Sequence, residues 1–469
     1  MKKINIFWAF SPILLLIVLL SLNVIFFSDN ATSGANQIAL VISAMFGVLI
    51  AKKFGIKWEN LQKGIIESIS SSMNAILILL IIGSLAGTWL ISGIIPAMIY
   101  YGVQILDPNI FLFATCIICA IVASAIGSSW TTVATIGIAL ISIGKVLGIP
   151  IELTAGAIIS GGYFGDKISP LSDTTNLASA MGGVNLITHI KYMLYTTLPS
   201  ITISLILFLI IGFQFSGEID RTEINNILNS IETNFKITPL LFITPLVMIY
   251  LIIKKTAPFP ALFIGTILGA VTAFLFQENI ILLISGEQIF NYTAAYKAIM
   301  QAMFGDISIG NNLLESGGMK GMLNTIWLII CAMIFGGVME KSGFLKSIAN
   351  RIMQNTKTNG SLVASTAGTC LFFNMTAADQ YLAIIVPGRM YKEIYKKRKL
   401  APENLSRTLE DTGTVTSVLI PWNTCGAYHY GILGVSTFAY LPYCFFNLIS
   451  PVMTLVYAYA KIKIRKSDV

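Results

Sequence analysis

One stretch in the first half of the chain gathers side chains that could bind a cation. Residues 161–176 read GGYFGDKISPLSDTTN, so two carboxylates, Asp166 and Asp173, stand inside an otherwise apolar run. Glycine and proline interrupt a helix and leave backbone carbonyls without intrahelical partners. Carbonyl, hydroxyl, amide and carboxylate oxygens together suit a small alkali cation, and a carboxylate supplies the opposite charge. The stretch therefore predicts a discontinuous helix with a cation site at its break.

The candidate ligands at this break share oxygen-bearing side chains. They are Asp166, Ser169, Ser172, Asp173, Thr174, Thr175 and Asn176. Asp166 has two readings, because the adjacent Lys167 could form an internal ion pair with it. Asp173 is flanked by hydroxyls, so a binding role is favoured there. An ionisable side chain at membrane depth costs a few kcal/mol or more unless it is paired, which makes such residues functional candidates.

Acidic and amide side chains interrupt the second half in a similar way. Asp379 stands at the centre of an apolar stretch, and Pro421-Trp422-Asn423-Thr424 interrupts a later one. Glu410 and Asp411 lie shortly before that break, but acids are also favoured at the start of a helix by its dipole. A carboxylate that holds either a cation or a proton, never both, has the chemistry of an exchanger. Asp173 and Asp379 are the predicted proton-coupling residues.

The composition places most of the chain in a lipid bilayer. Of 469 residues, 55% are apolar and 11% are charged, with a mean hydropathy of +0.79; soluble domains carry about 25% charged residues. The net charge of +8 does not indicate nucleic-acid binding, because the lysines cluster in short loops between apolar runs. Residues 6–27 are too long for a cleaved signal peptide and are predicted to be the first span. Cys116 and Cys119 form a CxxC inside an apolar run, where helix packing is favoured over metal binding.

Ten apolar segments are candidates to cross the hydrocarbon layer, which takes about 20 helical residues. They are 6–27, 37–51, 73–105, 153–176, 192–213, 238–253, 259–276, 321–339, 411–430 and 436–460. Segment 287–305 leaves the number of crossings open.

Basic loops favour the cytoplasmic side of a membrane. Lys2 and Lys3 at the start, the loops 340–358 and 389–407, and the tail 461–469 are all basic. Both termini are therefore expected to be cytoplasmic.

Two apolar stretches are broken at their centres and are predicted to be re-entrant hairpins. Residues 361–388 lie between two basic loops, so they should enter and leave the membrane on one side. Residues 110–144 have the same form, with a break at Gly127-Ser128-Ser129 and flanks that are not basic in sum. Non-helical backbone survives at membrane depth only where protein or a watery cavity surrounds it.

The two halves match at an offset of about 247 residues, hairpin over hairpin and break over break. Five crossings between equivalent spans make the halves inverted, an arrangement found in many secondary transporters. The predicted fold class is an all-α polytopic membrane protein with two inverted repeats, each with a re-entrant hairpin and a discontinuous helix. The predicted divisions are N-terminal spans and a basic loop (1–70), a first repeat (71–213, with hairpin 110–144 and broken helix 153–180), connecting spans and loops (214–320), a second repeat (321–460, with hairpin 361–388 and broken helix 408–430) and a basic tail (461–469).

Several long motifs resemble the NhaC family of Na⁺/H⁺ antiporters. GGYFGDKISPLSDTTNLASA is similar to the family's central signature, and IGSSWTTVATIGIALI is similar to the segment before it. NLSRTLEDTGTVTSVLIPWNTCGAY and GVSTFAYLPYCFFNLISP are similar to its C-terminal half. The resemblance covers roughly residues 70–460. It implies that further residues lie at or near the ion path, with Na⁺ at Asp173, Asn176 and Asn423. These further residues are Ser128, Ser129, Thr376, Asn423 and Thr424.

The resemblance implies a secondary active transporter that exchanges Na⁺ for H⁺ by alternating access in a bacterial cytoplasmic membrane. Na⁺ would be the transported or coupling ion, with no organic cofactor. The same group contains malate/lactate exchangers and amino-acid carriers, so Na⁺-coupled transport of a small organic solute is the alternative. The matched motifs show no obvious intramembrane arginine, which leans slightly against a dicarboxylate. Arg389 and Arg407, in or beside the basic loop, could still reach an anion.

Two other classes are less favoured. An ion channel would need a continuous pore. An enzyme is not expected, because the chain has no HExxH or GxSxG motif. The expected partners are Na⁺, H⁺ and the lipid bilayer, with the organic solute and a homodimer as further options.

Overall fold

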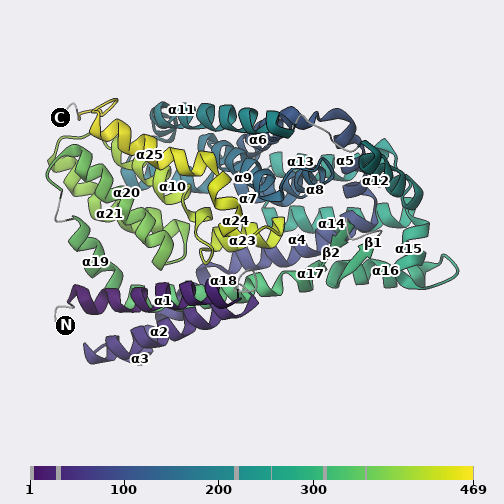
Figure 1. Ribbon diagram of the computed structural model, residues 1–469. Coiled ribbons are helices and arrows are strands. Elements are labelled where there is room, and N and C mark those ends of the chain that lie inside the picture. The colour runs from purple at the N-terminus through teal and green to yellow at the C-terminus, as the bar shows by residue number, and fades with distance from the viewer. Residues whose placement is uncertain are drawn as a thin grey trace.

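The computed structural model describes residues 5–27, 33–215, 221–254, 256–309, 314–353 and 356–467, and in these ranges the chain is almost entirely helical. The single sheet in this part of the chain is an antiparallel pair of β1 (Ile307–Ile309) and β2 (Leu314–Ser316). Figure 1 shows long helices that run roughly along the length of the molecule. The predicted all-α fold is confirmed, while Lys2 and Lys3 lie outside the described residues.

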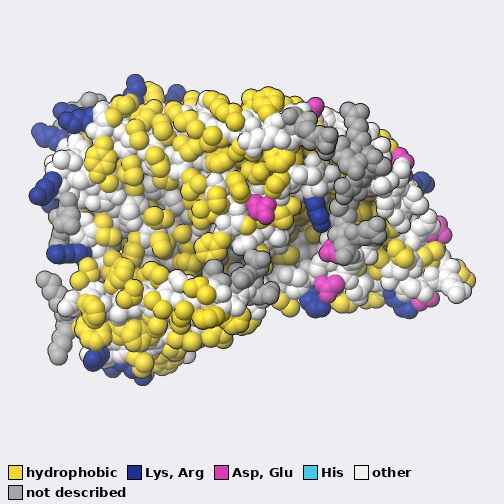
Figure 2. All heavy atoms as spheres, in the orientation of Figure 1, with side chains coloured by type: hydrophobic (Ala, Val, Ile, Leu, Met, Phe, Trp, Pro, Cys, Tyr) yellow, Lys and Arg dark blue, Asp and Glu magenta, His cyan; other side chains and the backbone are white. Residues whose placement is uncertain are grey.

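Eight helices in the described ranges are long and apolar enough to cross a membrane. They are α1 (Ile6–Phe27), α2 (Ala35–Lys53), α4 (Met73–Ile91), α6 (Pro108–Ile126), the run of α7 (Ser129–Thr132) and α8 (Ile138–Val146), α11 (Leu186–Gly212), α14 (Pro258–Phe276) and the run of α17 (Gly318–Gly321) and α18 (Leu323–Lys341). Figure 2 shows hydrophobic side chains over the middle of the visible face and basic side chains gathered at the end that carries the C-terminus. The predicted polytopic membrane protein is confirmed.

The remaining helices form the broken spans, the second hairpin and the connections. They are α3 (Trp58–Ser71), α5 (Ile94–Ile105), α9 (Ile151–Ile168), α10 (Asp173–Gly182), α12 (Arg221–Asn234), α13 (Ile243–Ile253), α15 (Glu278–Ser285), α16 (Tyr292–Phe304), α19 (Phe344–Met353), α20 (Asn359–Thr376), α21 (Gln380–Lys397), α22 (Glu403–Thr408), α23 (Thr424–Leu433), α24 (Thr437–Tyr440) and α25 (Phe445–Tyr459).

Two segments differ from the expected spans. Segment 73–105 is two helices, because Gly93 between α4 and α5 adopts a left-handed conformation, φ 78°, that a continuous helix excludes. Segment 287–305 holds α16, whose 13 residues reach about 20 Å and fall short of the hydrocarbon layer of about 30 Å. α16 instead packs along α4, where Ser84 Oγ donates a hydrogen bond to the Met303 carbonyl at 2.9 Å.

The order of elements from α4 to α11 recurs from α18 to α25. Each half has a long helix and a short one, two hairpin legs, a helix broken before its last part and a final long segment. Ser172 caps the helix after the first break, and Asn423 caps the helix after the second. Equivalent helix boundaries of the two halves therefore lie about 250 residues apart, slightly more than the offset of about 247 residues predicted from the sequence.

The tips of the two hairpins have the same construction. Gly127 (φ 76°) ends α6 before Ser128 caps α7, and Ala378 (φ 58°) follows α20 before Asp379 caps α21. Ser128 Oγ accepts a hydrogen bond from the Thr131 N–H at 3.2 Å. A left-handed residue followed by a capping side chain lets the chain turn and start a new helix.

The last helices of the two halves run antiparallel. Phe208, near the end of α11, packs on Phe445 at the start of α25, with ring centroids 4.9 Å apart. Tyr192, near the start of α11, donates a hydrogen bond to the Lys463 carbonyl just beyond α25. The equivalent last helices of the two halves thus run in opposite directions, as the predicted inverted repeats require.

The two hairpins consequently open toward opposite ends of the molecule (Figure 1). The leg that starts the first hairpin packs beside the end of α11, where Gly212 lies against the Asn109 carbonyl. The leg that starts the second hairpin packs beside the end of α25, where Gly360 lies against the Tyr459 ring.

Small residues let the first hairpin leg and the broken helix pack at backbone contact. A Cβ placed on Gly161 of α9 would lie 2.1 Å from the Cys116 carbonyl oxygen of α6, and one on Gly165 would lie 2.2 Å from the Ala120 carbonyl oxygen. Cys116 and Cys119 are buried free thiols on this leg. Close approach through small residues is a general way for helices to associate in lipid.

We expect Gly161→Ala to destabilise the protein by about 1–3 kcal/mol, because the opposing atom is backbone and cannot move aside easily. Gly368→Ala on α20 is the matched control, since no atom lies within 4 Å of the added Cβ. That control should be neutral or stabilising by up to about 1 kcal/mol. Thermal unfolding of the purified variants in detergent measures both, and equal midpoints would contradict the close packing of α6 and α9.

Candidate ion-binding cavity

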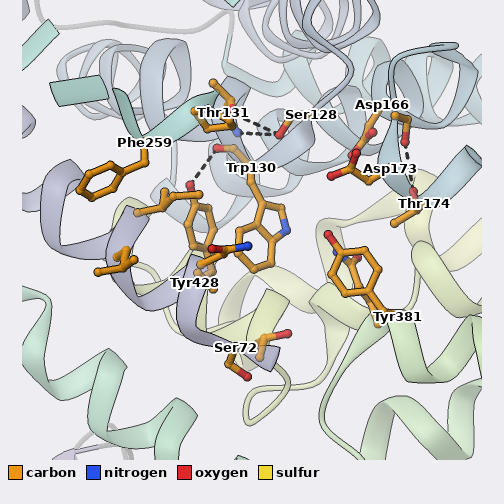
Figure 3. A pocket seen from close by; sticks show the side chains of 18 of the residues that line it. Ser72, Ser128, Trp130, Thr131, Asp166, Asp173, Thr174, Phe259, Tyr381 and Tyr428 are labelled. Carbon is orange, nitrogen blue, oxygen red and sulfur yellow. Dashed lines mark hydrogen bonds between the residues drawn. The ribbon is translucent and has the colours of Figure 1, made fainter. Parts of the chain in front are cut away.

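The interruptions of both halves meet at one cavity of about 410 Å³ (Figure 3). Its walls are the two hairpin tips, the break between α9 and α10, the start of α23, and the starts of α4 and α14. The lining residues are Ser71, Ser72, Asn74, Ala75, Leu77, Ile78, Gly127, Ser128, Trp130, Thr131, Asp166, Ser172, Asp173, Thr174, Ala257, Pro258, Phe259, Asp379, Gln380, Tyr381, Thr424 and Tyr428.

The cavity brings together seven of the predicted site residues. They are Ser128, Asp166, Ser172, Asp173, Thr174, Asp379 and Thr424. Each hairpin tip touches the break of its own half: Gly127 lies against Leu171, and the Ala378 carbonyl accepts a hydrogen bond from the Thr424 N–H at 2.9 Å. The repeat thus places two tips and two breaks around a shared space.

Asp166 is held by the first hairpin tip. Its Oδ2 accepts hydrogen bonds from the Ser129 N–H at 2.9 Å and the Ser129 Oγ at 2.7 Å, and its side chain is 8% exposed. The amide at a helix N-terminus and a hydroxyl both stabilise a carboxylate. Ser129 therefore belongs to the site through Asp166, although it does not line the cavity itself.

The other two carboxylates approach the cavity from the break and from the second tip. Asp173 is the first residue of α10 and is exposed, and Figure 3 shows it beside Asp166. Asp379 is 4% exposed, and its Oδ1 accepts a hydrogen bond from the Leu382 N–H at 2.9 Å. Among the lining residues in the described part of the chain there is no Lys, Arg or His, so three acids face the cavity without a fixed positive charge.

The structure places the remaining predicted residues behind the cavity wall. Thr175 Oγ1 donates to the Lys167 carbonyl at 3.0 Å, and Thr376 Oγ1 donates to the Phe372 carbonyl at 2.6 Å. Ser169 Oγ accepts a hydrogen bond from the Leu171 N–H at 3.3 Å.

The two asparagines predicted as Na⁺ ligands also bond to backbone. The Asn176 Nδ2 donates to the Pro170 carbonyl at 3.0 Å, and the Asn423 Nδ2 donates to the Asn374 carbonyl at 3.0 Å. Asp173 is the member of the predicted Na⁺ set that lines the cavity.

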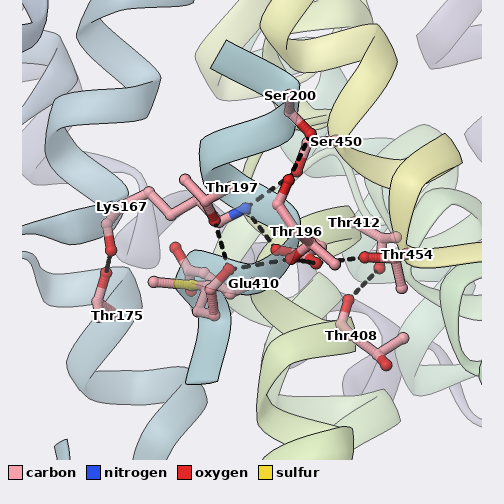
Figure 4. Close-up of polar contacts among 12 residues, drawn as sticks. Lys167, Thr175, Thr196, Thr197, Ser200, Thr408, Glu410, Thr412, Ser450 and Thr454 are labelled. Atoms are coloured by element: carbon pink, nitrogen blue, oxygen red, sulfur yellow. Dashed lines mark hydrogen bonds and ion pairs between the residues drawn. The ribbon is translucent and has the colours of Figure 1, made fainter. Parts of the chain in front are cut away.

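Lys167, in the first half, forms an ion pair with Asp411 in the second half and not with the adjacent Asp166. The Lys167 ammonium forms an ion pair with Asp411 and donates to Ser450 Oγ at 3.0 Å (Figure 4). Asp411 also accepts hydrogen bonds from Thr196 Oγ1, at 2.7 Å, and from Thr454 Oγ1. Both charged side chains are 0% exposed. The ion pair considered between Asp166 and Lys167 is therefore not formed, because Lys167 pairs with Asp411.

Glu410 and Asp411 do not lie at the start of a helix. They stand in a π-helical turn, Leu409–Thr414, that continues α22 from its start at Glu403. Glu410 is 0% exposed, and its Oε1 accepts a hydrogen bond from Thr174 Oγ1 at 3.1 Å, which connects the cavity wall to this interior acid. The helix dipole therefore does not account for these two acids, because the helical run begins at Glu403, before them.

Sequence reasoning also missed an aromatic wall. Trp130 of the first tip stacks on Tyr428 of α23, with ring centroids 4.1 Å apart, and the Tyr428 hydroxyl donates to the Trp130 carbonyl at 3.2 Å. Tyr381 and Phe259 line other parts of the cavity (Figure 3). The only available signal was the presence of aromatic residues within the two polar interruptions.

Removing one partner of the Lys167–Asp411 pair should cost more than removing a surface pair. We expect Lys167→Met to destabilise the protein by about 3–5 kcal/mol, because Asp411 is left buried without its countercharge. Replacing both partners, as in Lys167→Met with Asp411→Leu, should recover much of that loss. Denaturant or thermal unfolding in detergent measures the difference.

The matched control is Lys320→Met, which breaks the exposed pair with Asp306, a 2.9 Å contact whose side chains are 66% and 71% exposed. An exposed pair contributes about 0–1 kcal/mol. Similar losses for Lys167→Met and Lys320→Met would show that the buried pair does not hold the two halves together.

The chain is similar to known transport proteins over most of its length. The Na⁺/H⁺ antiporter family is matched over residues 3–175 and 161–462. A relative described as a malate-2H⁺/Na⁺-lactate antiporter, from Bacillus subtilis, is 38% identical over 425 residues, which cover 90% of this chain and 89% of the relative. A Na⁺/H⁺ antiporter NhaC from Alkalihalophilus pseudofirmus is 35% identical over 92% of each chain. An arginine/ornithine antiporter ArcD from Halobacterium salinarum is 34% identical over 91% of this chain and 86% of that protein.

The family match covers nearly the whole chain, and these relatives share more than a third of its residues over most of their length. This protein is a member of the Na⁺/H⁺ antiporter family.

Proposed function

We propose that this chain is a secondary active transporter that exchanges Na⁺ for H⁺ by alternating access through the cavity. The observation that carries the proposal is the meeting of both hairpin tips and both helix breaks around three carboxylates with no fixed cation among the described lining residues. Uncompensated carboxylates at this depth are stable when they hold a cation or a proton. Competition between the two for one site couples their movements.

Within this proposal Asp166, Asp173 and Asp379 form the primary cation set. Asp166 and Asp173 belong to the broken helix of the first half, and Asp379 belongs to the hairpin of the second. Relative movement of the two halves would change the distances among these acids. Asn176 and Asn423 support the set by holding the backbone at the breaks, since their amides bond to carbonyls there.

The central experiment is transport in proteoliposomes that contain a pH dye, with ²²Na⁺ in the outer solution. A Na⁺ gradient should move protons in the opposite direction with no organic solute present, and the rate should saturate with Na⁺. Asp166→Asn, Asp173→Asn and Asp379→Asn should each lower coupled exchange by about tenfold or more, because each removes a charge that binds the cation.

Asp306→Asn is the control for these variants, because Asp306 is exposed and pairs with Lys320 away from the cavity. It should transport as the unmodified protein does. An Asp173→Asn variant with full coupled exchange would remove Asp173 from the mechanism. Flux that rises without saturation would favour a channel, and movement only with an organic solute would favour the alternative class.

A second candidate, Na⁺-coupled exchange of a small organic solute, has specific support. The cavity of about 410 Å³ falls in the size range of small-molecule sites. The relatives include proteins named for malate and lactate and for arginine and ornithine. These solutes differ in charge, so the names alone do not select one for this chain.

We further propose that both termini face the cytoplasm of a bacterial cell. Lys461, Lys463, Arg465 and Lys466 lie beyond α25 at the end where basic side chains gather (Figure 2). Basic segments favour the cytoplasmic side.

Labelling of single cysteines tests this orientation. Lys466→Cys and Glu278→Cys introduce thiols at exposed positions, whereas the six native cysteines are buried. A membrane-impermeant maleimide should label Glu278→Cys in intact cells and should label Lys466→Cys only after the membrane is opened. The reverse pattern would overturn the proposed orientation.

A further inference from the structure

The charge of the cavity selects against an anionic solute. Asp166, Asp173 and Asp379 line it, and the lining residues in the described ranges include no basic side chain. A solute that carries only carboxylates would meet like charges in the cavity. This repulsion weakens its binding and discriminates against anionic ligands. A molecule with a protonated amine would meet opposite charges.

The aromatic wall gives the cavity a surface that a metal ion does not use. Trp130 stacks on Tyr428 with an interplanar angle of 24°, and because Tyr428 is completely buried beneath it, the partly exposed Trp130 is the ring that a ligand can contact. Na⁺ is a hard cation that takes oxygen ligands, whereas aromatic faces bind organic cations and the carbon chains attached to them. The wall lies across the cavity from the Asp166 and Asp173 carboxylates in Figure 3. An organic body with a charged end would meet both surfaces at once.

One donor at this wall is unused. The Trp130 Nε1 is buried and has no hydrogen-bond partner within the residues that the structure describes. An indole N–H can only donate, and a buried donor without an acceptor is costly. Figure 3 shows this nitrogen on the edge of the ring turned toward Asp173 and Tyr381. A carboxylate on an amine-bearing solute would supply an acceptor there.

We propose that this cavity binds a small organic ammonium compound in competition with Na⁺, with its amine at the carboxylates and its carbon chain against Trp130. This inference rests on the proposed transport function and names the class of organic solute that the cavity accepts. The compound can be a simple amine or an amino acid, and these two sources share the ammonium chemistry. A dicarboxylate of the same length would meet like charges at the same three carboxylates and should compete less well.

The test uses three probes of similar chain length that differ in their charged groups: 1,5-diaminopentane with two amines, L-lysine with two amines and a carboxylate, and glutarate with two carboxylates. Each probe competes with ²²Na⁺ for binding to the purified full-length protein in detergent. 1,5-Diaminopentane or L-lysine should displace Na⁺ at concentrations at which glutarate does not. Displacement by the diamine indicates that the ammonium group suffices, and displacement by L-lysine alone indicates that the carboxylate is also bound.

Variants of Trp130 separate the ring from its N–H group. Trp130→Ala should weaken binding of the displacing amine about tenfold more than it weakens Na⁺ binding, because it removes the aromatic face. Trp130→Phe keeps a ring and removes the donor, so it should weaken L-lysine more than 1,5-diaminopentane. Trp327→Phe is the control, because Trp327 is 44% exposed on α18 and does not line the cavity.

Three results would overturn the inference: glutarate that competes as well as the amines, amines that do not compete at all, or amine affinity that is unchanged in Trp130→Ala. The Na⁺/H⁺ exchange assay without organic solute, run on the same preparations, distinguishes a failure of the organic-ligand proposal from a failure of the proposed antiport function. Exchange without amine binding refutes the organic ligand alone, whereas amine binding without exchange refutes Na⁺/H⁺ antiport alone.

Discussion

A helix that stops inside an apolar layer leaves carbonyl and amide groups that lipid cannot satisfy, and the rest of this structure depends on meeting that requirement. The side chains around the breaks supply the missing partners. Thr175 bonds to the Lys167 carbonyl in the first half, and the Asn374 Nδ2 donates to the Gly413 carbonyl at 2.7 Å in the second. The Trp422 Nε1 donates to the Met375 carbonyl at 2.7 Å at the second hairpin tip. Many polar residues of the interruptions therefore hold the backbone open, and the acids are left to face the cavity.

The buried ion pair then decides the charge of that cavity. Lys167 follows Asp166 in sequence, but its ammonium turns away to Asp411 in the other half, where Thr196, Thr454 and Ser450 complete the polar surroundings. A buried pair that is fully hydrogen-bonded is tolerated, whereas one buried charge alone is not. Because Lys167 is committed there, the three acids have no resident countercharge in the cavity lining. A mobile cation or proton must supply it, which is the physical basis of exchange.

The two repeats have the same construction but different chemistry at equivalent positions. Ser128 caps the first hairpin tip and Asp379 caps the second, while Ser172 and Asn423 cap the helices after the breaks. Ser128, Ser172 and Asp379 line the cavity and Asn423 bonds to backbone behind it, so equivalent backbone positions carry unlike side chains. The stacked pair of Trp130 and Tyr428 joins the first tip to the second broken helix, so the cavity exists only when both halves are assembled.

The sequence by itself determined the membrane solvent, the two hairpins, the broken helices and most of the acids of the site. Hydropathy and punctuation by Gly, Pro and polar residues are local properties, and they predict where helices run and where they stop. The positions of the basic loops predicted that the two halves are inverted, because basic loops favour the cytoplasmic side of a membrane.

Only the tertiary structure decided which polar side chains face the cavity and which satisfy backbone. Asn176 and Asn423 look like ligands in the sequence, yet the carbonyls that they bond lie beside them only in the folded chain. Likewise, Lys167 and Asp411 are far apart in sequence, and their pairing follows from the packing of α9, α11 and α25 around the π-helical turn. Long-range pairing is set by how the halves pack together, and no local pattern of residues carries that information.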